Sequence, residues 1–300
     1  MVKLQDGIGK VIKVDITFYF YNNYQLEEFE AYLLQHIRSI TNSKGGFIYT
    51  TQEESEEGEG DTFYVKCDYF SFNTSLFNVN NISRDYRLDI NYALECVIYE
   101  AGEEKFIEFV GNILRSSDGD ALLLKDSEYR IIERSNGFII VDHYFFHESY
   151  KALNLPYEQG KFKKYLLQIS SCYTTDEIMC RIREIVTDWE QQTKLEIIED
   201  PSYPDEFVLN LKGIQVIVVN IKTSINISCS QIFRFNRRDE LEVMLSIFKE
   251  LITKFNGDFV LSKTEGYWEQ EKSVLVESKD GKKVINEQAI EARFIHEINF

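Results

Sequence analysis

Only a few groups of residues in this chain have the types and spacing that chemistry would need. His143 and His147 are separated by three residues, with Asp142 and Glu148 beside them. On a helix this spacing would bring two imidazoles to one face, as a metal site requires. The segment is aromatic and follows a predicted strand, however, and the HExxH motif of zinc enzymes is absent. We therefore predict an aromatic surface turn, with no metal and no cofactor.

Two Gly-Asp steps, Gly119-Asp120 and Gly257-Asp258, each lie between a helix-like run and a strand-like run. Acids beside glycine occur in calcium loops, but an EF-hand loop needs further ligands and a distal glutamate, which are not found here. A structural role is simpler. We predict that each glycine ends its helix in the left-handed conformation and that each aspartate hydrogen-bonds the turn.

The densest charge in the chain is a run of acids without a base: Glu53, Glu54, Glu56, Glu57, Glu59 and Asp61. This acidic loop has three interpretations: a solvated insertion, a docking site for a basic protein, or a weak site for divalent cations. Metal binding ranks last, because an acidic loop without rigid geometry binds metals poorly. Among the functional interpretations we favour docking, and we assign these residues to partner binding.

The sequence lacks the signatures of catalysis. It has no GxSxG motif, P-loop, dinucleotide-binding glycine pattern or kinase motif. The cysteines are widely spaced without a CxxC pair and are predicted to be reduced core residues: Cys67, Cys96, Cys172, Cys180 and Cys229. We predict that the protein is not an enzyme and has no catalytic residues.

Charge limits the partners. The formal net charge is −17, and residues 1–155 contain 26 acids and 14 bases, which gives −12 of that total. A field of this sign repels nucleic acid and anionic membranes, so we expect neither as a partner. It attracts basic proteins or cations, although an acidic surface also serves solubility. A small basic group consists of Arg234, Arg237 and Arg238. Asp239 and Glu240 follow at once, which predicts local ion pairing at a helix start.

The hydropathy of the chain predicts a cytoplasmic protein. No run of about 18 apolar residues exists that would span a membrane. Residues Met1–Lys13 lack the apolar segment of a signal peptide.

The elements that would position these residues form the same plan twice. A strand, a helix, extended segments, a second helix, a Gly-Asp step and an apolar strand follow one another in each half. In the first half the main segments are Ile12–Tyr21, Gln25–Ile40, Glu103–Arg115 and Ala121–Leu124. Between its helices we predict two further strands, Thr62–Phe72 and Tyr86–Tyr99, separated by the polar, turn-rich stretch Asn73–Ser83. After its second helix we predict a hairpin around Ser135-Asn136-Gly137. In the second half the main segments are Lys163–Ser170, Thr175–Gln192, Arg238–Phe255 and Phe259–Leu261. Two domains, 1–155 with the acidic loop and 156–300, are predicted.

Apolar stripes on the helices align between the halves. On the second helix, Phe106, Phe109 and Ile113 match Met244, Ile247 and Leu251 at one offset, which also pairs the Gly-Asp steps. On the first helix, Phe29, Leu33 and Ile37 match Ile178, Ile182 and Val186 at a larger offset. We predict a tandem duplication of a β-α-β-β-β-α-β-β module, an α+β fold with antiparallel sheets and helices on one face. Convergence of two α+β halves is the alternative.

The order of a helix, a Gly-Asp step and a strand also resembles the pattern of a known family. It spans Asn112–Leu123 and returns at Lys254–Leu261. The pattern resembles the immunity proteins encoded beside bacterial polymorphic toxins, several groups of which are small α+β modules with such a step. The resemblance implies a cytosolic antitoxin that binds one cognate toxin domain and blocks its active site without chemistry of its own. Its binding residues vary between members, so it assigns none here.

Three functions therefore stay open on the sequence. The preferred one is a non-catalytic acidic binding protein, an immunity protein that neutralises a basic toxin domain. The alternative is a small-molecule or cation-binding module with a ligand site between the two copies. The third is an unrecognised hydrolase that uses acids of the first half.

Overall fold

The structure is a computed structural model. It describes residues 14–41, 48–52, 62–75, 79–126, 128–170, 173–174, 176–178, 180–182, 184, 195–199, 206–211, 214–221, 224–234, 238–255, 257–265 and 273–286. The chain divides into two compact units, Met1–Gln159 and Gly160–Phe300. The sequence placed this boundary slightly earlier, after residue 155.

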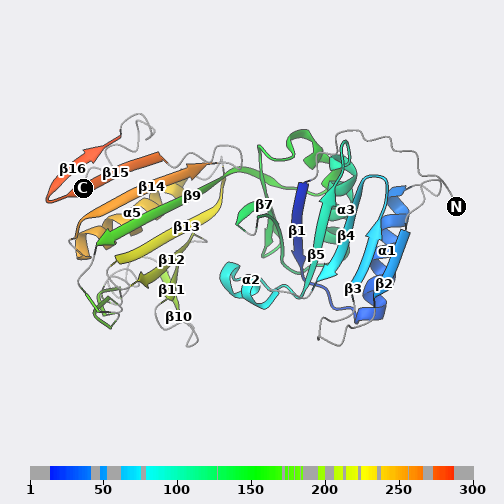
Figure 1. Ribbon diagram of the computed structural model, residues 1–300, viewed down its shortest axis with the longest axis horizontal. Helices are drawn as coiled ribbons and strands as arrows, with labels where there is room; N and C mark the ends of the chain where they lie inside the picture. The colour runs from blue at the N-terminus through cyan, green and yellow to red at the C-terminus, as the bar shows by residue number, and fades with distance from the viewer. Residues whose placement is uncertain are drawn as a thin grey trace. The chain divides into compact units, whose positions relative to one another are not determined.

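The first unit is an antiparallel sheet with two long helices on one side. Its strands are β1 (Val14–Phe20), β2 (Ile48–Gln52), β3 (Thr62–Lys66), β4 (Phe70–Ser75), β5 (Tyr92–Ile98), β6 (Ala121–Lys125), β7 (Tyr129–Ser135) and β8 (Phe138–Asp142). Its helices are α1 (Leu26–Thr41), α2 (Val79–Tyr86), α3 (Glu103–Ser116) and a 3-10 helix (His147–Leu153). The strand order is β2-β3-β4-β5-β1-β6-β7-β8. Figure 1 shows α1 and α3 behind these strands.

The second unit has a sheet of the same kind. Its strands are β9 (Glu158–Ser170), β10 (Leu195–Glu199), β11 (Glu206–Leu211), β12 (Ile214–Ile221), β13 (Ser224–Arg234), β14 (Phe259–Glu265), β15 (Ser273–Lys279) and β16 (Lys282–Ile285). The long helix α5 (Arg238–Phe255) precedes β14, and the described residues of 176–184 are helical. The pairings give the order β10-β11-β12-β13-β9-β14-β15-β16, antiparallel throughout.

The predicted apolar stripes form the cores. Phe29, Leu33 and Ile37 of α1 are fully buried, and α3 buries its own stripe against the same face of the sheet. Aromatic rings fill this interface, with Phe72 and Phe109 stacked at a centroid distance of 5.4 Å. In the second unit the corresponding side chains of both helices meet in one core, as predicted, while Val186 lies outside the described residues. Burial of these stripes is what holds the helices to the sheets.

The predicted element count was wrong. Each unit contains eight strands among its described residues, two more than the predicted module. The expected strand Thr62–Phe72 is a hairpin, because the chain turns at Cys67, whose N–H donates to the carbonyl oxygen of Phe70 at 2.9 Å. The residues before β5, which were expected to be loop and strand, form the helix α2, whose buried residues are Val79 and Ile82. The coarser prediction, an α+β fold with antiparallel sheet, is confirmed.

The Gly-Asp steps close a corner at the centre of each sheet. The backbone oxygen of Asp120 accepts the N–H of Tyr21 at 3.0 Å, and that of Asp258 accepts the N–H of Ser170 at 2.8 Å. Each carboxylate then reaches the turn of the following hairpin. Asp120 Oδ1 accepts the N–H of Asn136 at 3.3 Å, and Asp258 Oδ1 accepts the N–H of Asp280 at 2.9 Å. Each aspartate therefore hydrogen-bonds a turn, but that turn belongs to the following hairpin and is not the predicted one at the Gly-Asp step.

The predicted role of the glycines was wrong. Left-handed backbone occurs instead at the hairpin turns, where φ is 79° at Gly137 and 74° at Gly281. At the Gly-Asp steps glycine is needed for close approach. A Cβ at Gly119 would overlap the side chain of Tyr21, and a Cβ at Gly257 would overlap the carbonyl oxygen of Ser170.

We predict that Gly257→Ala destabilises the protein by about 1–3 kcal/mol, because the backbone of β9 must shift to admit the methyl group. Urea unfolding followed by circular dichroism measures this change. Gly281→Asn is the matched control, since its surroundings are open and asparagine tolerates left-handed backbone. A Gly257→Ala protein as stable as the control would contradict the close-packing account.

Candidate functional site

The residues that the sequence assigned to partner binding lie outside the described part of the chain: Glu53, Glu54, Glu56, Glu57, Glu59 and Asp61. The structure does describe the residues on either side of them. Gln52 and Thr62 are paired across β2 and β3, so the acidic loop connects the ends of this hairpin. The hairpin lies at the β2 end of the first sheet's strand order.

The two histidines do not share a helix. His143 follows β8, and its Nδ1 lies 3.1 Å from Oε1 of Gln159. His147 begins the 3-10 helix with a φ of 45°. Among the described residues, no group of three His, Cys, Asp or Glu side chains is placed to hold a metal ion.

The cysteines and the basic group at the start of α5 were the other residues noted in the sequence. Cys67, Cys96 and Cys229 are buried and reduced, as predicted, whereas Cys180 is exposed and Cys172 is outside the described residues. The predicted ion pairing at the start of α5 is confirmed for Arg234, whose Nε donates to Oε1 of Glu240 at 2.7 Å.

Polar contacts between α1 and α3 bring a serine near a histidine. Ser116 Oγ lies 3.4 Å from Nε2 of His36 and 2.6 Å from the hydroxyl of Tyr32. Ser116 Oγ also donates to the backbone oxygen of Asn112 at 2.9 Å, which is the usual behaviour of serine in the last turn of a helix. Burial and the nearby Arg115 lower the pKa of His36. These contacts join the two helices.

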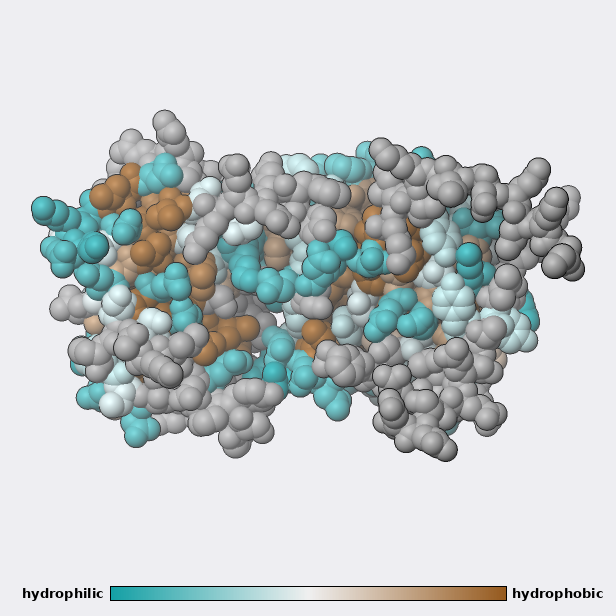
Figure 2. Space-filling model, in the orientation of Figure 1, coloured by the Kyte–Doolittle hydropathy of each residue, from teal (hydrophilic) through white to brown (hydrophobic). Residues whose placement is uncertain are grey.

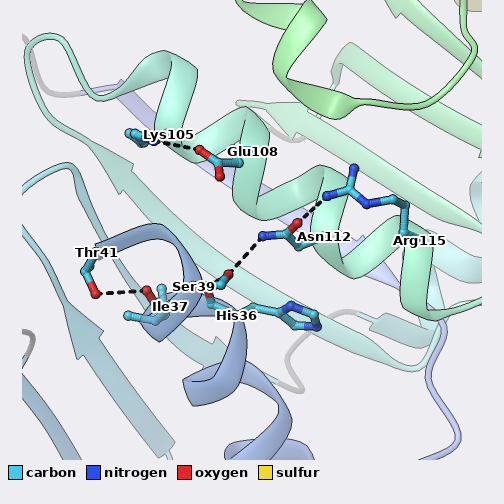
Figure 3. Close-up of polar contacts among 8 residues, drawn as sticks. All are labelled: His36, Ile37, Ser39, Thr41, Lys105, Glu108, Asn112 and Arg115. Carbon is cyan, nitrogen blue, oxygen red and sulfur yellow. Dashed lines mark hydrogen bonds and ion pairs between the residues drawn. The ribbon is translucent and has the colours of Figure 1, made fainter. Parts of the chain in front are cut away.

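Figure 3 shows the outer side of the same helix pair. The side-chain amide of Asn112 donates to Oγ of Ser39 at 3.3 Å, and Arg115 donates in turn to Asn112. Lys105 and Glu108 pair along α3 at 2.8 Å. Lys105 and Glu108 balance each other and Arg115 contributes one positive charge, so the residues drawn here carry no excess of negative charge for a basic partner.

The face of the first sheet opposite α1 and α3 carries a row of polar side chains. Directly paired residues point to the same side of a sheet, so the register defines which side chains lie together. Tyr64 is paired with Asn73, Asn73 with Glu95, and Glu95 with Thr17. These four side chains form a polar row across β3, β4, β5 and β1. Asp15, paired with Val97, stands one step along the same face.

These residues line a cavity of about 350 Å³ together with Asp126. We call it the acidic groove and define it by six residues: Asp15, Thr17, Tyr64, Asn73, Glu95 and Asp126. Its three carboxylate residues are exposed. Three of the six residues are acids and none is a base, and Nζ of the neighbouring Lys125 pairs with Asp126 at 3.1 Å. Figure 2, which looks onto this side, shows hydrophilic residues at the surface among apolar ones.

Helix α2 covers the neighbouring part of the face. Val79 and Ile82 pack on side chains of β1, β5 and β6, including Tyr19 and Leu122. The guanidinium of Arg130 lies 4.6 Å from the ring centroid of Tyr86 at the end of this helix. Burial raises the pKa of Tyr86 to about 12. On this face of the first sheet, the apolar cluster under α2 therefore lies beside the polar row.

The second unit has other residues at the corresponding positions. Phe20 pairs with Ala121 in the first unit as Ile169 pairs with Phe259 in the second, each just after its Gly-Asp step. Counting from these pairs, Lys164 stands at the position of Asp15, Ser228 at that of Glu95 and Thr264 at that of Asp126. The register agrees, because Ser228 pairs with Leu166 as Glu95 pairs with Thr17. The three acids are therefore particular to the first unit.

A basic group instead lies in the second sheet. Lys161 and Lys263 each approach Glu265 at 2.7 Å, and Lys163 lies at 3.6 Å. Burial opposes ionisation of Glu265, but the hydrogen bonds from the first two lysines and the charge of the third outweigh it and lower its pKa to about 2. This glutamate links β14 to β9 by pairing with lysines of both strands.

No protein-family model matches the chain, and no curated protein matches it. Within the described residues, no helix has the length and apolar character needed to cross a membrane.

We predict that Glu265→Gln lowers the stability at pH 7 by about 1–2 kcal/mol, a figure reduced for solvent screening. Because the pKa of Glu265 is lower in the folded protein, its carboxylate stabilises the fold at pH values above the unfolded pKa of about 4.3. That contribution is lost as the pH falls toward the folded pKa of about 2. The difference from the wild type should therefore shrink between about pH 4 and pH 2 in thermal melts.

Glu277→Gln on β15, an exposed position, is the control and should change little. A Glu265→Gln deficit that is constant with pH would mean that packing, rather than charge, is the contribution of this side chain.

Proposed function

We propose that this chain is a non-catalytic acidic binding protein of the immunity type, which binds and neutralises a cognate basic toxin domain. The observation that carries this proposal is the acidic groove. Three exposed carboxylate residues, from β1, from β5 and from the position just after β6, lie on a sheet face that α1 and α3 leave open. Matching positions in a sheet of the same strand order carry none of them.

The charge of the whole chain favours the same partner. A net charge of −17, most of it in residues 1–155, creates a field that accelerates association with a positively charged protein. Rapid capture is what an antitoxin needs, because a free toxin acts as long as it is unbound. We place the complex in the cytoplasm, where such a toxin would act.

We further propose that the two units arose by tandem duplication. The strand orders correspond element by element, the central pairs share one register, and both Gly-Asp corners make the same two hydrogen bonds. The offsets are those that align the helix stripes. In this view the first unit gained an acidic face and the helix α2, which lies between β4 and β5. The corresponding strands of the second unit, β12 and β13, are separated only by residues 222–223.

The test is capture followed by neutralisation. The full chain is immobilised and exposed to native cytosol at about 0.01 M and about 1 M salt, where the Debye length falls from about 30 Å to about 3 Å. We expect one basic protein to be retained only at low salt. Expressed alone it should arrest growth, and coexpression with this chain should restore growth. A captured protein that is harmless when expressed alone would contradict the immunity function.

The acidic loop has its own prediction. With Glu53, Glu54, Glu56, Glu57, Glu59 and Asp61 changed to their amides, the affinity for the captured partner should fall at low salt and the salt dependence should become shallower. Titration calorimetry at several salt concentrations measures both quantities. An unchanged affinity and salt dependence would remove the loop from the interface.

A further inference from the structure

We infer that the acidic groove is the docking surface for an extended basic segment of the partner, with lysine or arginine side chains seated against Glu95, Asp15 and Asp126. This inference rests on the proposed function and names the surface and the chemistry of its occupant. The occupant is a stretch of polypeptide in the extended conformation, with basic residues at alternate positions.

The spacing of the carboxylates matches such a segment. Asp15 and Glu95 lie on adjacent strands, and each stands two residues from the other's paired position. Diagonal neighbours of this kind are about 7–8 Å apart in an antiparallel sheet. Side chains on one face of an extended chain repeat every two residues, or about 6.6 Å. Consecutive basic side chains of the partner can therefore each meet one carboxylate.

The same spacing disfavours a metal ion as the occupant. Oxygen ligands of calcium or magnesium lie about 2.0–2.6 Å from the ion, so carboxylates that share one ion must converge. Among the described residues no trio of possible ligands does so. Ammonium and guanidinium groups on long side chains need only one carboxylate each, which suits charges distributed along a groove.

The uncharged residues of the groove suit the stems of these side chains. Tyr64 is 36% exposed at one end of the polar row and offers its ring to an aliphatic stem or a cation. The amide of Asn73 donates to Oε2 of Glu95 at 3.2 Å and so orients that carboxylate. The first unit already contains a contact of the same type, with Nζ of Lys66 lying 5.9 Å from the ring centroid of Tyr99.

The fold itself does not require these acids. Lys164, Ser228 and Thr264 occupy the matching positions of the second sheet, which keeps the same strand order and central register. The fold leaves these three positions free to vary, and in the first copy they carry like charges. Such positions are where we expect a binding surface to differ between the two copies.

The experiment uses the full chain and a short oligolysine peptide as probe. The groove variant is Asp15→Asn, Glu95→Gln and Asp126→Asn. The control variant is Glu28→Gln, Glu100→Gln and Glu104→Gln, which removes the same charge from exposed residues outside the groove. At low salt we expect the groove variant to bind the peptide about tenfold more weakly and the control less than about twofold more weakly. Circular dichroism melts confirm that both remain folded.

Carbodiimide cross-linking of the peptide to the wild-type chain provides a second readout, because it joins an amine to a carboxylate that it touches. Mass spectrometry should place the cross-links at Asp15, Glu95 or Asp126. Equal loss of affinity in the two variants, or cross-links confined to residues 53–61, would overturn the groove as the docking surface and leave the proposed function standing. Absence of salt-sensitive binding to the wild-type chain would overturn both.

Discussion

An aspartate at the corner of each sheet is the constraint on which the rest of the structure depends. Asp120 follows α3 and Asp258 follows α5, and each comes directly before the strand that pairs with the central strand of its sheet. The backbone oxygen sets the register of that pair, and the carboxylate ties it to the next hairpin. Because a slip of one residue would turn every side chain to the opposite face, this corner decides which residues are core and which are surface.

Once the register is set, the two faces of the sheet have different tasks. Aromatic and aliphatic side chains on one face bind α1 and α3, and few changes are tolerated there because the packing is dense. The open face carries different side chains in the two units. The first unit uses it for α2 and the acidic groove, while the second has a lysine and two hydroxyl residues at the corresponding positions. Function in this chain is therefore expected on the face that the helices leave open.

Sequence patterns predicted the parts of this arrangement that depend on local periodicity. The stripes of α1, α3 and α5, the Gly-Asp corners and the hairpin turn before Phe138 are readable because their residues are near in sequence. The break at Cys67 and the helix α2 were missed, since a two-residue change of direction and a short polar helix leave weak patterns. The glycine of each step was misassigned because close approach to Tyr21 or Ser170 depends on tertiary packing.

The acidic groove could not be predicted from local patterns, because Asp15, Glu95 and Asp126 are far apart in the chain and meet only through strand register. One signal was present. Applying the helix offsets to the neighbouring strands would have aligned Asp15 with Lys164 and Asp126 with Thr264, and so exposed a charge difference between the halves. The acidic loop, conspicuous in the sequence, lies outside the described residues, and its role remains a prediction.

The most direct test of this account is hydroxyl-radical footprinting of the full chain with and without oligolysine at low salt, because it reports the exposure of individual side chains. The account predicts protection of Tyr64 in the groove, with no change at Tyr24 or Tyr144, which are exposed elsewhere in the first unit. Unchanged labelling of Tyr64 under conditions where the peptide is bound would contradict it.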